Sequence, residues 1–457
     1  MEIPEAKAVD ERESKEISRG KPLFEVFRIR NFLLLWIGQG FSLLGDQFQF
    51  IALPWLVLQL TGTGLAIGAV LAIAGIPRAL FMLVGGALTD RFSPRVLMLG
   101  STLLRFGLVT VLAALVLTNV VELWMLYVFA LVFGLVDAFF YPSQMSMVPQ
   151  VVDRELLQIG NALIQGVGQL SMFVGPVLAG VLIAWLGSGE QVAGAAKAAP
   201  DMKGIGFAFG FSAITYLISI TTLWLIRIGK GEKQINNAGE TESVLSSIKE
   251  GLATVWNDIT LRTTFLIVSA ISLLINGPFI VGIPILASSR FPEGAVAYGT
   301  IMSAWGAGSL LGLASAGALP KPPANRLGQV LMLLISIPGF GLVLLGIVSS
   351  VTIASLIGIV MGAANGYVVI TYTTWLQRRT PQAMLGRMMS VLMFAVVGLN
   401  PVSMMLAGAL IDLSPTALMV GAGSILILIL FVSAFNPAVQ DMGLERVSSH
   451  DGRVGMS

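Results

Sequence analysis

Twelve long apolar segments separated by short polar ones make up most of the chain. A helix needs about 20 consecutive apolar residues to cross the hydrocarbon core of a bilayer. The segments of about that length are Phe32–Leu60, Leu65–Leu88, Val96–Leu117, Leu123–Val148, Leu157–Leu186, Gly206–Ile226, Thr263–Ser288, Ala295–Leu319, Gly328–Val348, Ile353–Trp375, Met384–Ile411 and Ala417–Phe435. The pattern therefore predicts an all-α membrane protein with twelve transmembrane helices.

The composition agrees with a membrane protein and excludes other classes. Only 11% of the 457 residues are charged, against about 25% in a soluble domain. The lack of cysteine excludes a secreted disulfide scaffold, and a net charge of +2 leaves no basic surface for nucleic acid. No segment resembles a nucleotide-binding loop, so we expect a protein that is not an enzyme and that uses neither ATP nor a cofactor or metal.

The distribution of basic residues predicts the orientation of the chain. Twelve spans place both termini on one side of the membrane, and the side with more Lys and Arg faces the cytoplasm. Of the 27 Lys and Arg, only Lys197, Lys203 and Arg290 fall in segments opposite the termini, while Arg78 and Arg105 lie inside spans. The first residues contain no apolar region typical of a signal peptide. We therefore expect a multi-pass protein of the bacterial inner (cytoplasmic) membrane with both termini in the cytoplasm.

An internal repeat divides the chain into two halves. Val177–Ile183 (VLAGVLI) matches Met405–Ile411 (MLAGALI), and at nearly the same offset along the chain Asp46 aligns with Asn276. Some transporters are built from such parallel repeats. The predicted organisation is a cytoplasmic tail at 1–30, a six-helix bundle at 31–227, a cytoplasmic linker at 228–260 with an amphipathic helix at Ser243–Asn257, a second six-helix bundle at 261–436 and a cytoplasmic tail at 437–457.

Two motifs and span one resemble the major facilitator superfamily. The sequence GALTDRFSPR, which begins at Gly86, resembles the signature of its loop between spans two and three, with Ser93 and Pro94 as departures. The matching residues of this gating motif are Gly86, Asp90, Arg91 and Arg95. Span five resembles the antiporter motif of the family at Gly175, Pro176 and Gly180. Span one is similar to the drug–proton antiporter branch, which includes macrolide efflux pumps and enterobactin exporters.

The resemblance implies a fold and a transport cycle. The fold would be two six-helix bundles related by a pseudo-two-fold axis, and the protein would be a monomer. The gating motif would hold the two halves together on the cytoplasmic side. Asp90 would meet a partner near the start of span eleven, where the candidates are Arg387 and the helix N-terminus after Pro381. The arginine motif that many antiporters carry in span four is missing, and we interpret Arg105 in span three as its substitute.

Four ionisable residues lie deep inside the predicted spans: Asp46, Arg78, Arg105 and Asp137. An unpaired charge at that depth costs at least about 2.5–3.5 kcal/mol, so each needs a partner or an aqueous cavity. Static ion pairs that fix the packing of helices are one interpretation. The other is proton coupling, because an acid whose Arg partner moves would change its proton affinity. Arginine keeps its charge and would act as counter-ion or gate.

Polar residues at helical spacing accompany these acids. One face of span one carries Gln39, Ser42, Asp46 and Gln49, and one face of span four carries Phe133, Asp137, Tyr141 and Gln144. In the family, spans one, four, seven and ten line the central cavity. The resulting candidates for the substrate cavity are Gln39, Gln49, Tyr141, Gln144, Asn276, Asn365, Tyr367 and Tyr372.

The two halves differ in their charge. Asp46 and Asp137 align with Asn276 and Asn365, which are neutral. We infer that coupling resides in the first half and that the second half offers a neutral face to the substrate. The expected function is proton-coupled export of amphipathic small molecules, such as drugs or macrolides, by alternating access. The alternatives are a dedicated siderophore or metabolite exporter, a lipid flippase, and a scaffold or sensor that has lost transport.

Overall fold

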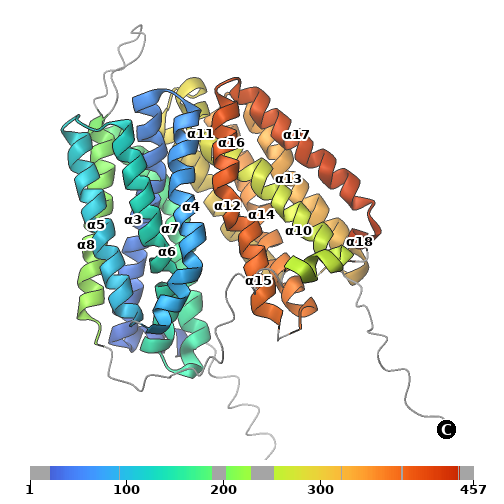
Figure 1. Ribbon diagram of the computed structural model, residues 1–457, viewed down its shortest axis with the longest axis horizontal. Helices are drawn as coiled ribbons and strands as arrows, with labels where there is room; N and C mark the ends of the chain where they lie inside the picture. Colours follow the sequence, from blue (N-terminus) through green and yellow to red (C-terminus); the bar gives the residue numbers. More distant parts are fainter. Residues whose placement is uncertain are drawn as a thin grey trace, which may run out of the picture. The chain divides into compact units, whose positions relative to one another are not determined.

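The computed structural model describes residues 21–91, 93–187, 202–227, 252–320, 322–381, 384–440 and 442, with side chains described except at 21–24, 82–91, 154 and 324. In this part of the chain twelve helical spans are long and apolar enough to cross a membrane, which confirms the predicted all-α membrane fold (Figure 1). Of the helix predicted at Ser243–Asn257, residues 252–257 are described and are helical. The rest of that helix, and His450, lie outside the described residues.

The first six spans are single helices. They are α3 (Arg30–Thr61), α4 (Gly64–Arg91), α5 (Pro94–Leu117), α6 (Leu123–Val151), α7 (Leu157–Leu186) and α8 (Met202–Leu225), with the short α2 (Lys21–Arg28) before α3 and the 3-10 turn η2 (Arg154–Leu156) before α7. The connection between α3 and α4 is tight, because Gly62 adopts a left-handed conformation with φ 69° and its N–H donates to the Leu58 carbonyl. A glycine at this position ends a helix without steric cost.

Two spans of the second half are interrupted. Span seven consists of α10 (Ile259–Ile271), the π-helical turn η3 (Ser272–Asn276) and α11 (Gly277–Arg290). Span eleven consists of α15 (Leu385–Met393), the π-helical turn η6 (Phe394–Gly398) and α16 (Asn400–Ile411). The remaining elements are α12 (Ala295–Ala318), η4 (Ala324–Arg326), α13 (Leu327–Ile347), α14 (Val351–Arg379), α17 (Pro415–Ala434) and the short α18 (Pro437–Gln440).

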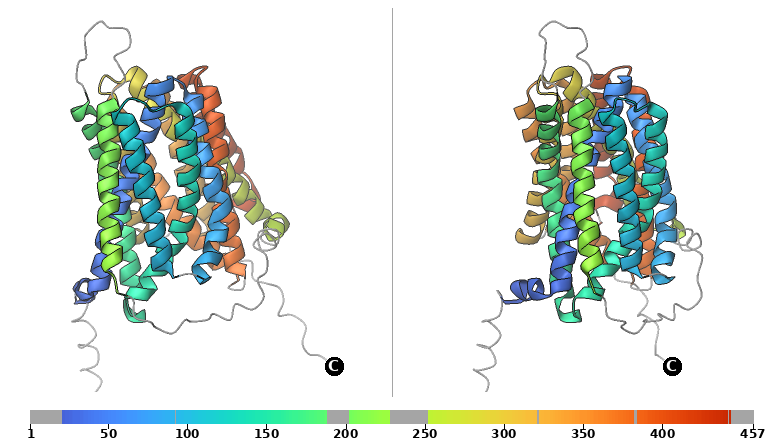
Figure 2. Two further views of the ribbon diagram at one scale, coloured as in Figure 1. Left: turned by 60° about the vertical axis from the view of Figure 1, so that its left-hand side comes forward. Right: turned by 90° about the vertical axis from the view of Figure 1, so that its left-hand side faces the viewer.

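The chain forms two compact units. One contains Met1–Gly62 and Ile73–Glu240, and the other contains Thr63–Ala72 and Thr241–Ser457. Helix α4 therefore belongs to both units, whereas the predicted first bundle, 31–227, assigned it to one. Figure 2 shows α3, α5, α6 and α8 of the first unit running side by side.

Asp412 explains why the start of α4 belongs to the second unit. Its Oδ1 accepts a hydrogen bond from the Gly64 N–H at 2.6 Å, and its Oδ2 accepts one from the Leu65 N–H at 3.1 Å. A carboxylate at this position satisfies free N–H groups and stabilises the positive end of the helix dipole. Next to this cap, Gly68 of α4 and Gly408 of α16 let the two backbones approach closely.

The internal repeat is visible in the packing of each unit. Helix α3 contacts α7 in the first unit, and α11 contacts α16 in the second. Gly134 of α6 faces the Ala74 carbonyl of α4, and Gly362 of α14 faces the Trp305 carbonyl of α12. Gly134 and Gly362 are aligned by the sequence repeat, and the two carbonyls that they face are separated along the chain by nearly the same offset. The equivalent pairs of spans, α4 with α6 and α12 with α14, thus each approach closely at a glycine.

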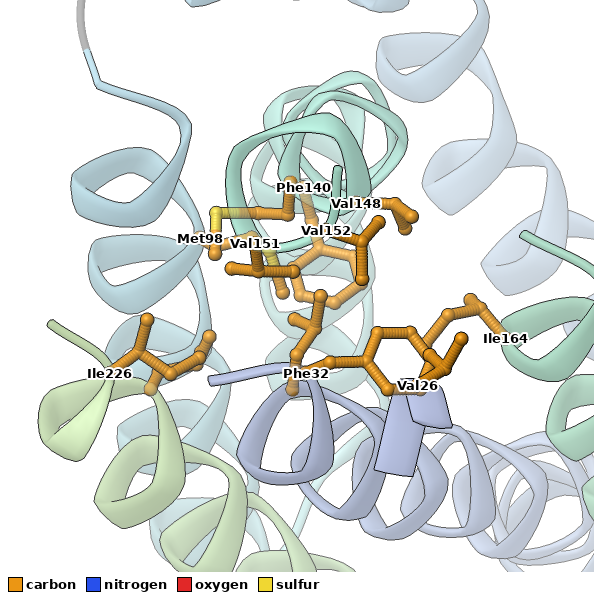
Figure 3. Packing of buried hydrophobic residues seen from close by; sticks show 12 residues of the cluster. Val26, Phe32, Met98, Phe140, Val148, Val151, Val152, Ile164 and Ile226 are labelled. Carbon is orange, nitrogen blue, oxygen red and sulfur yellow. The ribbon is translucent and has the colours of Figure 1, made fainter. Parts of the chain in front are cut away.

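An apolar core closes the first unit at the ends of its spans. Phe32 at the start of α3 lies among Phe140 and Val151 of α6 and Met98 of α5, as Figure 3 shows, and Ile226 after α8 joins them. All of these side chains are at most 7% exposed. The core fixes the positions of α3, α5, α6 and α8, from which the polar residues described next project.

Candidate functional site

The structure brings the four ionisable residues that were predicted deep inside the spans together in the first unit. Arg105 of α5 donates from Nη2 to Oδ1 of Asp137 on α6. Its Nη1 lies 3.6 Å from Oδ1 of Asp46 on α3. Arg78 of α4 reaches the other oxygen of Asp137, with Nη1 3.6 Å from Oδ2. We call Asp46, Arg78, Arg105 and Asp137 the charge cluster; its formal charges sum to zero.

The two carboxyl groups of the charge cluster have different partners. Asp137 contacts two guanidinium groups, and its side chain is 9% exposed. Asp46 contacts Arg105 and accepts a hydrogen bond from the Tyr216 hydroxyl at 2.6 Å; its side chain is 19% exposed. Two cations therefore neutralise Asp137, whereas one cation and a neutral hydroxyl stabilise Asp46.

Aromatic rings hold Arg105 at the centre of the cluster. The side chain is completely buried, with its Cζ 3.8 Å from the ring centroid of Phe140 and 5.4 Å from that of Phe133. Cation–π contacts stabilise a guanidinium that has been removed from water. Its Nε and Nη1 have no hydrogen-bond partner among the described residues, so the group depends on the two carboxylates and the two rings. This environment fixes the position of Arg105.

Tyr216 is a site residue of the first unit that was not predicted from the sequence. It lies in the middle of α8, is fully buried, and places its hydroxyl 3.4 Å from Oε1 of Gln49 in addition to Asp46. The family resemblance points to spans one, four, seven and ten for the cavity, and Tyr216 belongs to span six. A signal was present, because a buried tyrosine hydroxyl in an apolar span usually has a hydrogen-bond partner and the chain has just six tyrosines.

The two predicted polar stripes face each other further along α3 and α6. Gln144 donates from Nε2 to Oε1 of Gln39 at 2.9 Å, and Gln39 is 2% exposed. The Gln39 amide also lies 3.8 Å from Sδ of Met98. Tyr141 is half-buried beside the charge cluster on α6. Gln39 and Gln144 thus join two spans, while Gln49 and Tyr141 lie near the acids.

The predicted antiporter motif on α7 packs against α3 next to Asp46. Gly175, Pro176 and Gly180 are all buried. A Cβ at Gly175 would collide with the side chain of Gln47, the residue after Asp46. The glycine therefore lets α7 approach α3 closely at the level of the charge cluster.

The predicted gating motif is described only in part. Gly86, Asp90 and Arg91 lie in the last turns of α4, and their side chains are outside the described part of the structure. Arg95 donates from Nε to the Leu223 carbonyl at 3.0 Å and from Nη2 to the Trp224 carbonyl at 2.7 Å. It thus satisfies free carbonyls at the C-terminus of α8. Arg387 is partly buried in α15.

The candidates in the second unit lie on spans seven and ten. Asn276, the last residue of η3, donates from Nδ2 to Oδ1 of Asn400 at 2.7 Å. Next to it, Ser403 accepts from the Gly277 N–H at 2.8 Å and donates to the Leu273 carbonyl at 2.7 Å. These bonds satisfy backbone groups that the π-helical turn leaves free.

The other second-unit candidates lie along α14. Asn365, Tyr367 and Tyr372 are partly buried, and Tyr372 stacks on Trp375 with ring centroids 5.6 Å apart. Among the described residues, no group of three or more His, Cys, Asp and Glu side chains could hold a metal ion. The four ionisable residues that were predicted to lie deep inside the spans are all in the first unit, around Arg105.

Comparisons with known proteins identify the family of the chain. Residues 35–400 match the family model described as Major Facilitator Superfamily. The chain is 26% identical over 410 residues to the multidrug efflux pump Tap of Mycolicibacterium fortuitum, an alignment that covers 88% of this chain and 94% of that protein. It is 24% identical over 151 residues to macrolide efflux protein A of Streptococcus pyogenes, covering 33% and 37% of the two chains.

Solved transporter structures share the fold. A crystal structure of a POT family transporter in complex with a thioalcohol-conjugated peptide superposes with a TM-score of 0.67 at 14% identity, covering 90% of this chain and 96% of that one. A bacterial homologue of the iron transporter ferroportin, in its inward-facing state, gives a TM-score of 0.61 at 16% identity, covering 90% and 99%. At these identities the likeness shows the fold alone.

Proposed function

We propose that this chain, which belongs to the Major Facilitator Superfamily, is a proton-coupled antiporter that exports amphipathic small molecules, such as drugs or macrolides, by alternating access. Family membership and twelve spans make it a multi-pass membrane transporter. The relatives named as multidrug and macrolide efflux proteins support this direction of transport and this class of substrate. Proton coupling rests on a separate observation, the charge cluster of the first unit.

The unequal pairing of the two carboxyl groups is the observation that carries proton coupling. Asp137 contacts both guanidinium groups, whereas Asp46 contacts Arg105 at 3.6 Å and a neutral hydroxyl. Asp46 is also the more exposed of the two. A carboxylate takes up a proton more readily where fewer cations stabilise its charge. We therefore assign the transported proton to Asp46.

Binding of the proton changes the charge of the cluster. With both acids ionised, two negative charges balance two positive ones. A proton that binds a carboxylate oxygen of Asp46 adds one positive charge and leaves Asp137 as the counter-ion of Arg105. An unpaired charge inside the membrane costs about 2.5–3.5 kcal/mol. The protonated cluster therefore favours a conformation that hydrates Arg78, whose side chain is already 36% exposed, and loss of the proton restores the original state.

The polar groups outside the cluster are proposed to contact the substrate. The repeat places the neutral Asn276 and Asn365 where the first half has its acids. An apolar wall with a few polar groups suits large amphipathic ligands. The proposed contacts are Gln39, Gln49, Tyr141, Gln144, Asn276, Asn365, Tyr367 and Tyr372. We further propose that the protein is a monomer of the bacterial inner membrane with both termini in the cytoplasm, in line with its basic residues.

Transport by purified protein in liposomes tests proton coupling. With a pH gradient imposed, efflux of a macrolide or a cationic dye is followed for the wild type, Asp46→Asn and Asp137→Asn. We expect Asp46→Asn to abolish gradient-driven efflux but to retain exchange of labelled for unlabelled substrate without a gradient. Exchange that persists shows that the variant is folded and binds substrate, so the loss is specific to coupling.

Asp153→Asn is a matched control for this experiment. Asp153 is exposed between α6 and α7, and the substitution makes the same change of charge outside the spans. We expect it to transport at the wild-type rate. If both Asp46→Asn and Asp137→Asn keep gradient-driven efflux, the cluster is a set of static ion pairs and the proposed coupling is wrong.

A further inference from the structure

The hydroxyl group of Tyr216 has two acceptors but one hydrogen. It lies 2.6 Å from Oδ1 of Asp46 and 3.4 Å from Oε1 of Gln49, on the same face of α3. The shorter contact has the length of an O–H donor bound to an ionised carboxylate. In the structure the hydroxyl therefore donates to Asp46, and Gln49 stands within reach as a second acceptor.

Asp46 has charged or titratable neighbours on three further spans. Arg105 comes from α5, Asp137 and Tyr141 come from α6, and Arg78 comes from α4. Helix α7, which also packs against α3, carries no titratable residue. Tyr216 is the group from α8, and it is the neighbour that hydrogen-bonds directly to the Asp46 carboxyl.

We propose that Tyr216 is the positioning residue of the proton step, with a hydroxyl that donates to Asp46 while that residue is ionised and turns to Gln49 once it is protonated. The inference rests on the proposed proton-coupled function. The incoming proton binds Oδ1 of Asp46, and the new O–H donates to the Tyr216 oxygen. The hydrogen of Tyr216 rotates about its C–O bond toward Oε1 of Gln49. No covalent bond of Tyr216 or Gln49 forms or breaks, and one proton is gained in total, on Asp46.

A hydroxyl suits this position because it satisfies both forms of the acid. An ionised carboxylate needs a donor, and a carboxylic acid needs an acceptor for its own hydrogen. A buried donor or acceptor left without a partner costs about 1–3 kcal/mol. Tyr216 can supply either function, but only if Gln49 accepts the hydrogen that Asp46 no longer needs. The two residues therefore act together: Tyr216 bonds to Asp46 in both of its protonation states, and Gln49 accepts the Tyr216 hydrogen while Asp46 is protonated.

Two substitutions separate these roles by the pH dependence of gradient-driven efflux. Tyr216→Phe removes the donor to the ionised form, and a hydrogen bond to a charged group is worth more than one to a neutral group. We expect the alkaline midpoint of the pH–rate profile to move up by about one unit. Gln49→Leu removes the acceptor used in the protonated state, and we expect the midpoint to move down by about half a unit.

Tyr298→Phe is the matched control. Tyr298 is also fully buried, but it lies on α12 of the second unit. We expect the alkaline midpoint of the pH–rate profile of Tyr298→Phe to equal that of the wild type. A structural role of Tyr216 and Gln49 would lower the amount of folded protein or the maximal rate without shifting the two midpoints in opposite directions.

Infrared difference spectroscopy gives a second readout. The carbonyl band that appears on acidification is expected to vanish in Asp46→Asn and to change frequency in Tyr216→Phe, because the hydrogen bond of the acid is lost. If Asp46→Asn keeps gradient-driven efflux, the assignment of the transported proton to Asp46 is wrong and this inference fails with it; if Asp137→Asn keeps efflux as well, proton coupling itself is wrong. If Asp46→Asn loses efflux but Tyr216→Phe and Gln49→Leu keep the wild-type midpoint and band, the role of Tyr216 alone is wrong.

Discussion

At the scale of single residues, Arg105 is the cation on which the charge cluster depends. Arg105→Met is expected to leave Asp46 and Asp137 facing each other without the cation that they share. Removal of one partner from a buried ion pair lowers the free energy of unfolding by about 3–5 kcal/mol. Arg105→Lys keeps the charge but loses the planar fork, so a smaller loss is expected. Thermal unfolding in detergent measures both. Adding Asp137→Asn to Arg105→Met should restore part of the lost stability, and a double variant no more stable than Arg105→Met would contradict the shared-cation interpretation.

Asp258, just before α10, is expected to make stability depend on pH. Burial alone would raise its pKa, but hydrogen bonds from Arg379 at 2.9 Å and from the Leu261 and Thr260 N–H groups hold the pKa below its usual 3.8. A lowered pKa in the folded state stabilises the protein above the ordinary pKa, and the contribution disappears as the pH falls through the folded value. Asp258→Asn should therefore unfold at a lower temperature than the wild type at pH 7, with the difference shrinking below pH 3.8. A constant difference across this range would show that the charge has no role.

The charged residues of the site could be predicted from the sequence, but their hydrogen-bond partners could not. A charge inside an apolar span is visible in the sequence because it is expensive there. Arg95 shows the limit: its motif predicts a gating role, which stays a prediction, and the motif gave no sign that the side chain donates to the Leu223 and Trp224 carbonyls of α8. Which carbonyl or hydroxyl a side chain reaches depends on how the spans pack. Tyr216 and Ser403 were missed for the same reason.

At the scale of helices, close approach through glycine is expected to control the packing of each unit. A Cβ at Gly134 would collide with the Ala74 carbonyl, and one at Gly362 with the Trp305 carbonyl. Gly134→Ala and Gly362→Ala should therefore lower the unfolding temperature in detergent. Gly107→Ala is the control, because Gly107 is exposed on α5 and a Cβ there meets no atom within 4 Å. Equal stability of all three variants would show that the backbones can separate without cost.

The existence of the spans followed from hydropathy, while their interruptions did not. In the described part of the chain, the twelve predicted apolar runs correspond to twelve helical spans long and apolar enough to cross a membrane. The π-helical turn η6 (FAVVG) has an ordinary apolar sequence, and η3 (SLLIN) is apolar except for a polar residue at each end. At the end of η3, Asn276 donates to Asn400 of α16, a tertiary contact that hydropathy does not predict. Hydropathy therefore predicts a span and cannot show where its hydrogen-bond pattern changes.

At the scale of the whole molecule, the two halves share a packing scheme but differ in chemistry. The repeat predicted equivalent helices, and the glycine contacts of Gly134 and Gly362 recur at the predicted offset. The repeat could not show that the first residues of α4 belong with the second unit. They contact it through the hydrogen bond from the Gly64 N–H to Asp412, a residue far away in the sequence. Short-range patterns identify helices, whereas long-range contacts assign them to units.

The orientation of the whole chain can be tested with single cysteines. The sequence contains no cysteine, so an introduced one is the sole thiol. Ser188→Cys lies in the segment between the fifth and sixth spans, and Ser448→Cys lies near the C-terminus. Because the termini side carries most of the Lys and Arg, we expect a membrane-impermeant maleimide to label Ser188→Cys in intact cells and Ser448→Cys only after permeabilisation. The reverse labelling pattern would place the termini outside the cell. In that orientation, the proposed export would require protons to pass Asp46 in the opposite direction along the chain.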